Sequence, residues 1–587
     1  MKDFLKYTLA TIVGVLIVGF LAFFLFLSAL VSSVVQPDQE EPVAKHSILK
    51  IDLKGSISEQ TTENPLALLS GNYLTTGESL IDLCTAIKDA ADDNRIEGIY
   101  LDCGVLSADF ATDQELRRAL QEFKKSGKFI VAYGENYTQG CYYVASVADK
   151  VLINPEGTLE FQGIASSPLF YKDLMEKVGV KMQIFRVGTY KSYVEPYTLT
   201  AMSDANREQM TALITDLWKH IVGEVSESRK LSVDTLNLLA DRYLALEQTS
   251  AYVESGLIDA TAYADELRDI LRKQLGDTDV TFVSPKQMIQ EHKANQAKDK
   301  VAIYFASGSI VTEETSGLGI QDEEIVGSKV INDLDKLAQD KNIKAVVIRI
   351  NSGGGSAYAS EQIWRAVEKL KESKKVVVSM GGMAASGGYY MGCGADRIIA
   401  EPTTLTGSIG IFGMVPDASN LLENKLGLHE DAVRTNKGSD FASFSGKLSA
   451  DAGQAMQAYV DRGYQLFLSR VAAGRNMTTE AVNEIAQGRV WTGSQALELK
   501  LVDQLGNLDD AIKVAAQLAN LSNYGVVSPR KTVSLLDSFK QLRGDNYLER
   551  KIKDLVGDDL DALIFFLKNF DKQDRLQARI PFFLNFQ

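Results

Sequence analysis

The chain has 587 residues, 45% hydrophobic and 24% charged, which is a composition typical of globular proteins. At roughly 150 residues per domain, this length is too great for one core and predicts three or four units. The formal net charge of −15 excludes nucleic acid as the main partner, because phosphate binding needs clustered lysine and arginine.

The four cysteines are Cys84, Cys103, Cys141 and Cys393. None belongs to a Cys-x-x-Cys pair or stands beside a histidine, so we expect no metal site. We also expect no cofactor.

The N-terminal segment is apolar. Residues 7–37 contain no charged side chain, and Thr8–Val31 is almost wholly apolar. A membrane-spanning helix needs about 20 such residues, whereas the apolar region of a cleaved signal peptide has about 7–15. We therefore expect residues 1–35 to form a cytoplasmic stub and an uncleaved transmembrane anchor. Because Lys2 and Lys6 precede the apolar run and acidic residues follow it, the body of the protein should lie outside the cytoplasm.

Beyond the anchor we expect a polar tether (36–45), a first repeat (46–285), a charged connector (286–300), a second repeat (301–530) and a C-terminal extension (531–587). The repeats match in several places: Ile48–Ile57 with Val301–Ile310, Ile96–Cys103 with Ile343–Ile350, Tyr142-Tyr143 with Tyr389-Tyr390, and Ala148-Asp149 with Ala395-Asp396. The last three matches share one offset of 247 residues (343 − 96), so they align without a gap. This is a duplication on the scale of a domain.

Each repeat alternates strand-like and helical stretches. In the second repeat, the apolar runs Val346–Ile350 and Val376–Val378 flank a helical pattern over Glu361–Lys371. Such alternation predicts an α/β fold with βαβ crossovers and a largely parallel sheet. In the extension, Leu548–Phe570 has an amphipathic pattern. Arg579–Phe586 is a short apolar tail, and we expect it to pack on a partner or on its own domain.

Ser386 is the candidate nucleophile. It follows the apolar run Val376–Val378 on a turn that reads Ala384-x-Ser386-x-Gly388, a pattern similar to a nucleophile elbow. The preceding strand ends in Asn351-Ser-Gly-Gly-Gly-Ser356, and consecutive glycines free backbone N–H groups to line an oxyanion hole. The first repeat has the bulkier Gly104–Asp109 in that place and Gln139 opposite Ser386, so it has lost the acyl-transfer groups.

A nucleophilic serine needs a base. The histidines, His46, His220, His292 and His429, lie outside strand-end and glycine-rich contexts. The alternative is a lysine kept neutral by burial. Lys191, beside Tyr190 and Tyr193 on a glycine-bearing segment, fits this role. The second repeat has Thr435–Gly438 in the corresponding place, which leaves Lys437 as the next candidate.

Together these motifs resemble the signal peptide peptidase A family, in its long, duplicated, membrane-anchored form. That family of Ser-Lys proteases belongs to the Clp protease and crotonase-like superfamily. The motifs that carry the resemblance are Asn351–Ser356, Met383–Gly388, Thr406–Gly410, Gly488–Gly493 and Gly188–Ser192.

The resemblance implies tandem crotonase-like or Clp-like domains with Ser386 as nucleophile and Lys191 as general base. It implies that Ser408 orients the lysine, and that Gly354 or Gly355, with Gly387, supplies the oxyanion hole. Proline is usual in the family where this chain has Gly353. The family also implies a homotetrameric bowl in a bacterial inner membrane, with the catalytic body on the periplasmic side.

The expected function is a serine endopeptidase that degrades cleaved signal peptides and other apolar, unfolded peptides. A pocket built from Met383, Ala384 and Ala385 would favour cleavage after Leu, Ala or similar residues. Two alternatives remain, a crotonase-like acyl-CoA enzyme and a catalytically idle membrane scaffold.

Overall fold

The computed structural model describes residues 42–60, 62–63, 79–291, 297–314, 323–441, 443, 445–528, 531–532 and 576–580, and residues 7–8, 11, 14–15 and 18–19 near the N-terminus. Most of the expected anchor therefore lies outside the described residues, as do Leu548–Phe570 and the tail beyond residue 580. Within the described residues, no helix combines the length and the apolar character needed to cross a bilayer.

The first repeat is built on a six-stranded sheet with the strand order β7-β5-β4-β3-β1-β8. Every pairing in this sheet is parallel, as the alternating pattern predicted. Its strands are β1 (Ser47–Ser56), β3 (Ile96–Ser107), β4 (Phe129–Tyr137), β5 (Lys150–Leu159), β7 (Ala260–Thr261) and β8 (Thr281–Val283).

Helices cover this sheet, and their sequences explain where they begin. In α3, Leu80, Leu83, Ala86, Ile87 and Ala90 form one buried stripe with helical spacing, and the Ser79 side chain caps the first turn. The helices of this repeat are α3 (Leu80–Asp92), α4 (Phe110–Lys124), α5 (Gln139–Ala145), α6 (Lys172–Val178), α7 (Glu195–Thr198), α8 (Asp204–Arg229), α9 (Val233–Ala240), α10 (Thr249–Glu254), α11 (Leu267–Gln274) and α12 (Pro285–Glu291), with single 3₁₀ turns at η2 (Ser192–Val194) and η3 (Leu244–Leu246).

The second repeat has an eight-stranded sheet with the path β18-β16-β14-β12-β9-β20, joined by β15 and β19. All of its pairings are parallel except that between β16 and β18. Its strands are β9 (Lys300–Ser307), β12 (Ile343–Ser352), β14 (Lys375–Ala385), β15 (Arg397–Ala400), β16 (Leu405–Gly407), β18 (Val490–Thr492), β19 (Gln504–Leu505) and β20 (Gly525–Val527). Nearly all of β14 is buried, as expected for a parallel strand covered on both faces.

The helices of the second repeat are α13 (Gly327–Gln339), α14 (Ala357–Lys371), α15 (Gly387–Gly392), α16 (Ala450–Arg475), α17 (Thr479–Ile485), α18 (Gly493–Glu498) and α19 (Leu508–Leu518), with a π turn at η4 (Leu421–Lys425). The duplication is visible in the elements, because β3 and β12, α4 and α14, and β5 and β15 each begin 247 residues apart (343 − 96, 357 − 110 and 397 − 150). The structure thus confirms tandem α/β repeats.

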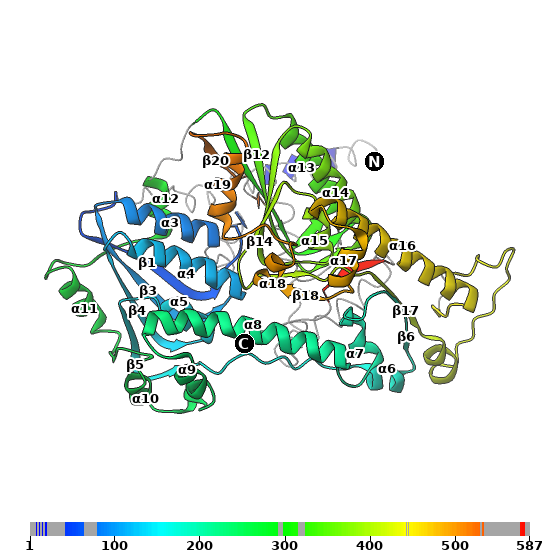
Figure 1. Ribbon diagram of the computed structural model, residues 1–587, viewed down its shortest axis with the longest axis horizontal. Coiled ribbons are helices and arrows are strands. Elements are labelled where there is room, and N and C mark those ends of the chain that lie inside the picture. Colours follow the sequence, from blue (N-terminus) through cyan, green and yellow to red (C-terminus); the bar gives the residue numbers. More distant parts are fainter. Residues whose placement is uncertain are drawn as a thin grey trace.

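A third sheet joins distant parts of the chain. Its order is β11-β10-β13-β22-β17-β6, from β11 (Glu324–Val326), β10 (Ser309–Val311), β13 (Gly354–Ser356), β22 (Gln577–Arg579), β17 (Phe412–Asp417) and β6 (Lys181–Arg186). Strand β6 of the first repeat therefore pairs with β17 of the second, far from β1, β3 and β4 (Figure 1). A separate parallel pair joins β2 (Thr62–Glu63) to β21 (Lys531–Thr532).

The two repeats also share buried polar contacts. The guanidinium of Arg349, on β12, is fully buried and contacts the carboxylates of Glu59 at 2.9 Å and Glu115 at 2.8 Å, both from the first repeat. Nearby, Arg118 of α4 contacts Glu401 at 2.5 Å. Burial raises the pKa of Glu401 to about 8, although Arg118 opposes this shift. Helix α8 runs across the lower part of the view, below α5 of the first repeat and α18 of the second (Figure 1).

Candidate active site

Ser386 lies on the sharp turn between β14 and α15. Its backbone has φ +55° and ψ −113°, a conformation that L-residues rarely adopt. Its N–H donates to the Gly407 carbonyl of β16 at 2.8 Å, and its own carbonyl accepts from Tyr390 N at 2.8 Å. The surrounding structure therefore holds the serine in a strained turn similar to a nucleophile elbow.

Lys191 lies in the loop between β6 and η2, directly before η2. Strand β6 is the strand of the first repeat that belongs to the third sheet. Its Nζ is 2.8 Å from Ser386 Oγ, 2.9 Å from Ser408 Oγ and 3.1 Å from the Ser408 carbonyl oxygen. All three residues are 0% exposed. The structure thus brings together, within one chain, the three side chains that the sequence singled out from the two repeats.

Burial sets the charge state of this lysine. Removal of the amine from water disfavours its charged form and lowers the pKa of Lys191 well below its usual value. A neutral amine has a lone pair that can accept a proton. The Ser386 hydroxyl lies 2.8 Å from this nitrogen, close enough to give up its proton to it. The pair can therefore generate a nucleophilic oxygen on Ser386.

Glycines make room for the buried lysine. Gly488 has φ +77°, and a Cβ there would lie 2.7 Å from Lys191 Cβ and 2.8 Å from Lys191 N. On the same side, a Cβ on Gly410 would lie 3.2 Å from Lys191 Cδ. Both glycines fall in motifs that the sequence singled out, although no role was predicted for either.

A polar network, which sequence reasoning missed, holds the loop of Lys191. Gln209 of α8 donates from Nε2 to the Tyr190 carbonyl at 3.2 Å and to Ser192 Oγ at 3.1 Å, and its Oε1 accepts from Val490 N at 3.1 Å. One amide thus joins α8, the residues on both sides of Lys191, and β18. The only sequence signal is a glutamine at a position of α8 that proves to be buried.

A second part of this network anchors the end of the same loop. The carboxylate of Glu195, which is 1% exposed, accepts from Asn206 Nδ2 at 3.1 Å and from Ser203 Oγ at 2.6 Å. Asn206 also accepts from Ser192 Oγ at 2.8 Å. The backbone on both sides of the lysine is therefore fixed to α8.

The glycine loop runs close to the nucleophile turn. Gly354 has φ +100°, and a Cβ there would lie 2.7 Å from the nitrogen of Gly387, the residue after Ser386. The Gly354 N–H donates to Ser352 Oγ at 3.1 Å, whereas Gly355 pairs with Ala578 of β22. Of the two candidates on this loop, Gly355 is therefore the one whose N–H faces the neighbouring strand.

The corresponding place in the first repeat holds no nucleophile. Gln139 lies at the start of α5, where the second repeat has Ser386. Its Oε1 accepts from Gln162 N at 2.9 Å and from Gly163 N at 3.0 Å, and its Nε2 donates to the Gly163 carbonyl at 3.1 Å. The amide is thus used to hold a loop.

The other candidate bases lie elsewhere. Lys437 is 90% exposed and pairs with Asp451 at 3.0 Å. His46 contacts Glu97, His220 contacts Ser494, and His429 is exposed. His292 lies outside the described residues.

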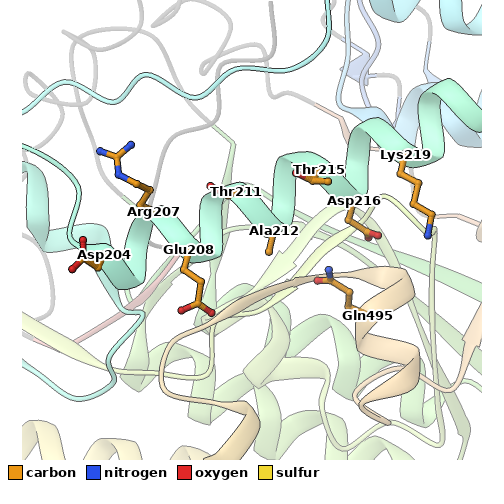
Figure 2. A pocket seen from close by; sticks show the side chains of 9 residues that line it. All are labelled: Asp204, Arg207, Glu208, Thr211, Ala212, Thr215, Asp216, Lys219 and Gln495. Carbon is orange, nitrogen blue, oxygen red and sulfur yellow. The ribbon is translucent and has the colours of Figure 1, made fainter. Parts of the chain in front are cut away.

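An open groove of about 670 Å³ lies along α8, lined by residues of that helix and by Gln495 of α18. Figure 2 shows the face of α8 that carries Glu208, Ala212 and Asp216 turned toward Gln495 of α18. Glu208 contacts Arg489 at 3.0 Å and Tyr190 at 3.3 Å. The described residues that line the groove do not include Lys191 or Ser386, so it borders the site without containing the reacting atoms.

The chain matches peptidase family S49 in two segments, residues 122–277 and 368–522. It belongs to peptidase family S49. One matched segment carries Lys191, and the other carries Ser386 and Ser408. Residues 299–404 also match the Clp protease family.

Named relatives in this family share most of their length with the chain. "Protease 4" of Salmonella typhi is 37% identical over 503 residues, which cover 82% of this chain and 80% of the relative. "Protease 4" of Haemophilus influenzae is 35% identical over 526 residues, with coverage of 86% and 84%. "Serine protease SPPA, chloroplastic" of Arabidopsis thaliana is 32% identical over 488 residues, with coverage of 82% and 70%.

Membership of the S49 family confirms the prediction of an SppA-type serine protease with peptide substrates. The sequence left two alternatives open, an acyl-CoA enzyme and an idle scaffold. These relatives are named as proteases, which favours neither alternative.

Proposed function

We propose that this chain is a membrane-anchored endopeptidase in which Ser386 is the nucleophile and Lys191 the general base. The observation that carries the proposal is the 2.8 Å approach of Lys191 Nζ to Ser386 Oγ, in a place where both residues are 0% exposed. Ser408, at 2.9 Å from the amine, orients it.

The geometry supports a two-step acyl transfer. Neutral Lys191 takes the proton of the Ser386 hydroxyl as the oxygen adds to the carbonyl carbon of a peptide bond. N–H groups of Gly387 and of Gly355 or Gly354 stabilise the oxyanion. Lys191 then gives its proton to the leaving amine. In the second step the same lysine takes a proton from water, the water oxygen adds to the acyl carbon, and Lys191 returns the proton to Ser386 Oγ as the ester bond breaks.

The proposed substrates are cleaved signal peptides and other apolar, unfolded peptides. Met383, Ala384 and Ala385 on β14 surround the turn with apolar side chains, of which those of Ala384 and Ala385 are fully buried. We expect cleavage after small or apolar residues, and little cleavage after Lys or Asp. Matched peptides that differ only at the cleaved position test this, and equal rates on charged and apolar residues would contradict it.

We also propose the topology and assembly. Thr8–Val31 anchors the chain in a bacterial inner membrane with the body on the periplasmic side, tethered by residues 36–45. The repeats, 46–285 and 301–530, with connector 286–300 and extension 531–587, assemble as a homotetramer. A reporter fused at Gln587 that is active only in the cytoplasm would contradict this topology, and light scattering of the purified protein tests the tetramer.

The decisive experiment measures peptidase rate between about pH 6 and 10 for the unaltered chain, Ser386→Ala, Lys191→Ala and Lys191→Arg. All three variants should be inactive. Ser386→Ala lacks the nucleophile, Lys191→Ala lacks the base, and the guanidinium of Lys191→Arg does not release its proton in this range. The rate of the unaltered enzyme should rise with pH as the remaining ammonium loses its proton. A serine-reactive phosphonate should label Ser386 in the unaltered chain alone. Substantial activity in Lys191→Ala would place the base elsewhere.

A further inference from the structure

Arg489 contacts two parts of the candidate site. It follows Gly488, the glycine that makes room for Lys191, and it directly precedes β18. Its carbonyl oxygen accepts from Ser408 N at 2.7 Å. Ser408 has φ +49°, and its hydroxyl and carbonyl oxygens both contact Lys191 Nζ. The backbone of Arg489 therefore fixes the serine that contacts the amine.

The side chain of the same arginine reaches the first repeat. Its guanidinium carbon lies 4.7 Å from the centre of the Tyr190 ring and 4.6 Å from the centre of the Trp491 ring. Both distances are within the range of cation–π contacts. Tyr190 directly precedes Lys191, and its N–H donates to the Gln487 carbonyl at 2.9 Å. The loop of Lys191 is thus held to the second repeat through backbone and side chain.

An acidic residue of α8 joins the same contact. Arg489 Nη1 donates to Glu208 Oε1 at 3.0 Å, and the Tyr190 hydroxyl donates to Glu208 Oε2 at 3.3 Å. The side chain of Glu208 is 57% exposed, whereas that of Arg489 is 20% exposed. Because an ion pair with an exposed partner contributes little by itself, we expect the two aromatic rings to hold the guanidinium.

The charge of Arg489 does not set the protonation of Lys191. Burial lowers the pKa of this lysine, and no charged group among the described residues contributes to the shift. Arg489 would therefore act on the amine through its position, because Tyr190 is covalently joined to Lys191. A planar guanidinium stacks on aromatic faces, which the compact ammonium of a lysine side chain does not.

We infer that Arg489 is a positioning residue, whose carbonyl fixes Ser408 and whose guanidinium fixes the loop of Lys191. Through these two contacts it aligns the amine of the first repeat with the Ser386 hydroxyl of the second. This inference rests on the proposed function and adds a residue that acts through its neighbours. It predicts that loss of the side chain slows the chemical step and leaves substrate binding nearly unchanged.

The first test compares Arg489→Ala with Arg207→Ala, the same change at an exposed arginine of α8. Peptidase kinetics and melting temperature are measured for both. Because a displacement of about 1 Å can cost about 100-fold, we expect kcat of Arg489→Ala to fall at least about tenfold, with KM nearly unchanged. Arg207→Ala should match the unaltered enzyme.

The pH profile is a readout that a merely structural role would not move. A loosened loop admits water to Lys191, and hydration raises its pKa toward the ordinary value. Because the reaction needs the neutral amine, the midpoint of the rise of kcat with pH should move to higher pH in Arg489→Ala. In Arg207→Ala the midpoint should equal that of the unaltered enzyme.

Chemical rescue separates the shape of the guanidinium from its charge. Arg489→Ala leaves space over the rings of Tyr190 and Trp491, which added guanidinium chloride can fill at millimolar concentrations, far below those that denature proteins. Guanidinium should restore part of kcat and move the midpoint back, whereas ammonium chloride at the same concentration should do neither. Arg207→Ala should respond to neither salt.

A conservative variant guards against loss of folding in Arg489→Ala. Arg489→Lys keeps the charge and can keep the ion pair with Glu208, but it loses the flat contact with the rings. We expect kcat to fall less than in Arg489→Ala, with a shift of the midpoint in the same direction. Melting temperatures establish which variants are folded.

The inference is wrong if a folded Arg489→Ala or Arg489→Lys keeps the pH midpoint of the unaltered enzyme. It is also wrong if guanidinium restores no more of the kcat of Arg489→Ala than ammonium does. Failure of the proposed function would look different: hydrolysis would persist after Ser386→Ala or Lys191→Ala, whatever the variants of Arg489 do.

Discussion

Lys191 is a buried amine, and its burial links the stability of the protein to pH. The folded-state pKa of Lys191 is lowered by desolvation, whereas the unfolded chain has the ordinary value. Between these two pKa values the unfolded state binds a proton that the folded state does not, so stability rises with pH across that window.

The first prediction follows from this sign. In the Ser386→Ala background, which removes the proposed nucleophile, the free energy of unfolding should increase as pH rises from neutral toward 10. The contribution of Lys191 to this slope approaches about 1.4 kcal/mol per pH unit within the window. Lys191→Met should remove that contribution. Urea unfolding at intervals of half a pH unit measures it, and equal slopes in both proteins would contradict the prediction.

Gly488 gives a second prediction at this scale. Gly488→Ala would bring a methyl group to 2.7 Å from Lys191 Cβ and displace the lysine. Because displacement of a catalytic group by about 1 Å can cost about 100-fold, we expect kcat to fall by about that factor. Gly427→Ala is the matched control, since Gly427 also has a positive φ, +68°, but has open space around it. A similar loss in both variants would attribute the effect to backbone strain alone.

At the scale of elements, the loop of Lys191 depends on α8. Gln209 bonds to the backbone of Tyr190, to Ser192 and to Val490, and it touches none of the reacting atoms. It is therefore a positioning residue, and it acts through the position of the amine.

The third prediction is that Gln209→Met lowers kcat by about tenfold or more, because the loop loses buried hydrogen bonds worth about 1–3 kcal/mol. KM should change little, and the pH dependence of kcat should shift as the environment of the amine loosens. Thr211→Ala, an exposed change two residues along α8, should match the unaltered enzyme. A fall in melting temperature with an unchanged pH profile would show that Gln209 is merely structural.

At the scale of the whole molecule, Arg349 joins the repeats. Its guanidinium contacts Glu59 and Glu115 in a fully buried place. Burial raises the pKa of Glu59, and Arg349 limits that rise. The stability of this buried cluster therefore depends on the guanidinium of Arg349 and on both carboxylates, Glu59 and Glu115.

The fourth prediction is that Arg349→Ala lowers the free energy of unfolding by about 3–5 kcal/mol, because it leaves buried carboxylates unpaired. Without Arg349 the folded-state pKa of Glu59 should rise further. The folded state would then bind more protons than the unfolded state, and the variant should regain stability as pH falls. Chemical unfolding from pH 5 to 8 tests this against Arg365→Ala, an exposed control. A deficit that does not change with pH would contradict the electrostatic account.

The sequence predicted the features that local pattern determines. Apolar runs such as Val376–Val378 became parallel strands, and the constant offset between repeats reappeared in the positions of the elements. The approach of Lys191 to Ser386 could be expected because each repeat retained only one of the two residues. The chemical roles of the site residues remain predictions.

Other features could not be predicted, for a physical reason. The pairing of β6 with β17, and of β22 with β13, joins segments far apart in the chain. The sequence of a short strand does not specify which other strand it pairs with. The expectation that the apolar tail would pack on a partner or on its own domain was correct for Arg579 and Ile580, which pack on this chain. Residues 581–586 lie outside the described residues.

The pairing of β6 with β17 also bears on how the protein is made. The ribosome finishes Arg186 of β6 226 residues before it reaches Phe412 of β17 (412 − 186). At about 5–20 residues per second, this interval lasts on the order of 10–45 s. During that time β6 emerges as an unpaired edge, a form prone to aggregation. The lysine that follows it has no serine to meet until Ser386 is made, 195 residues later (386 − 191). If Ser386 and Lys191 act as proposed, the order of synthesis delays proteolysis until both repeats have been made.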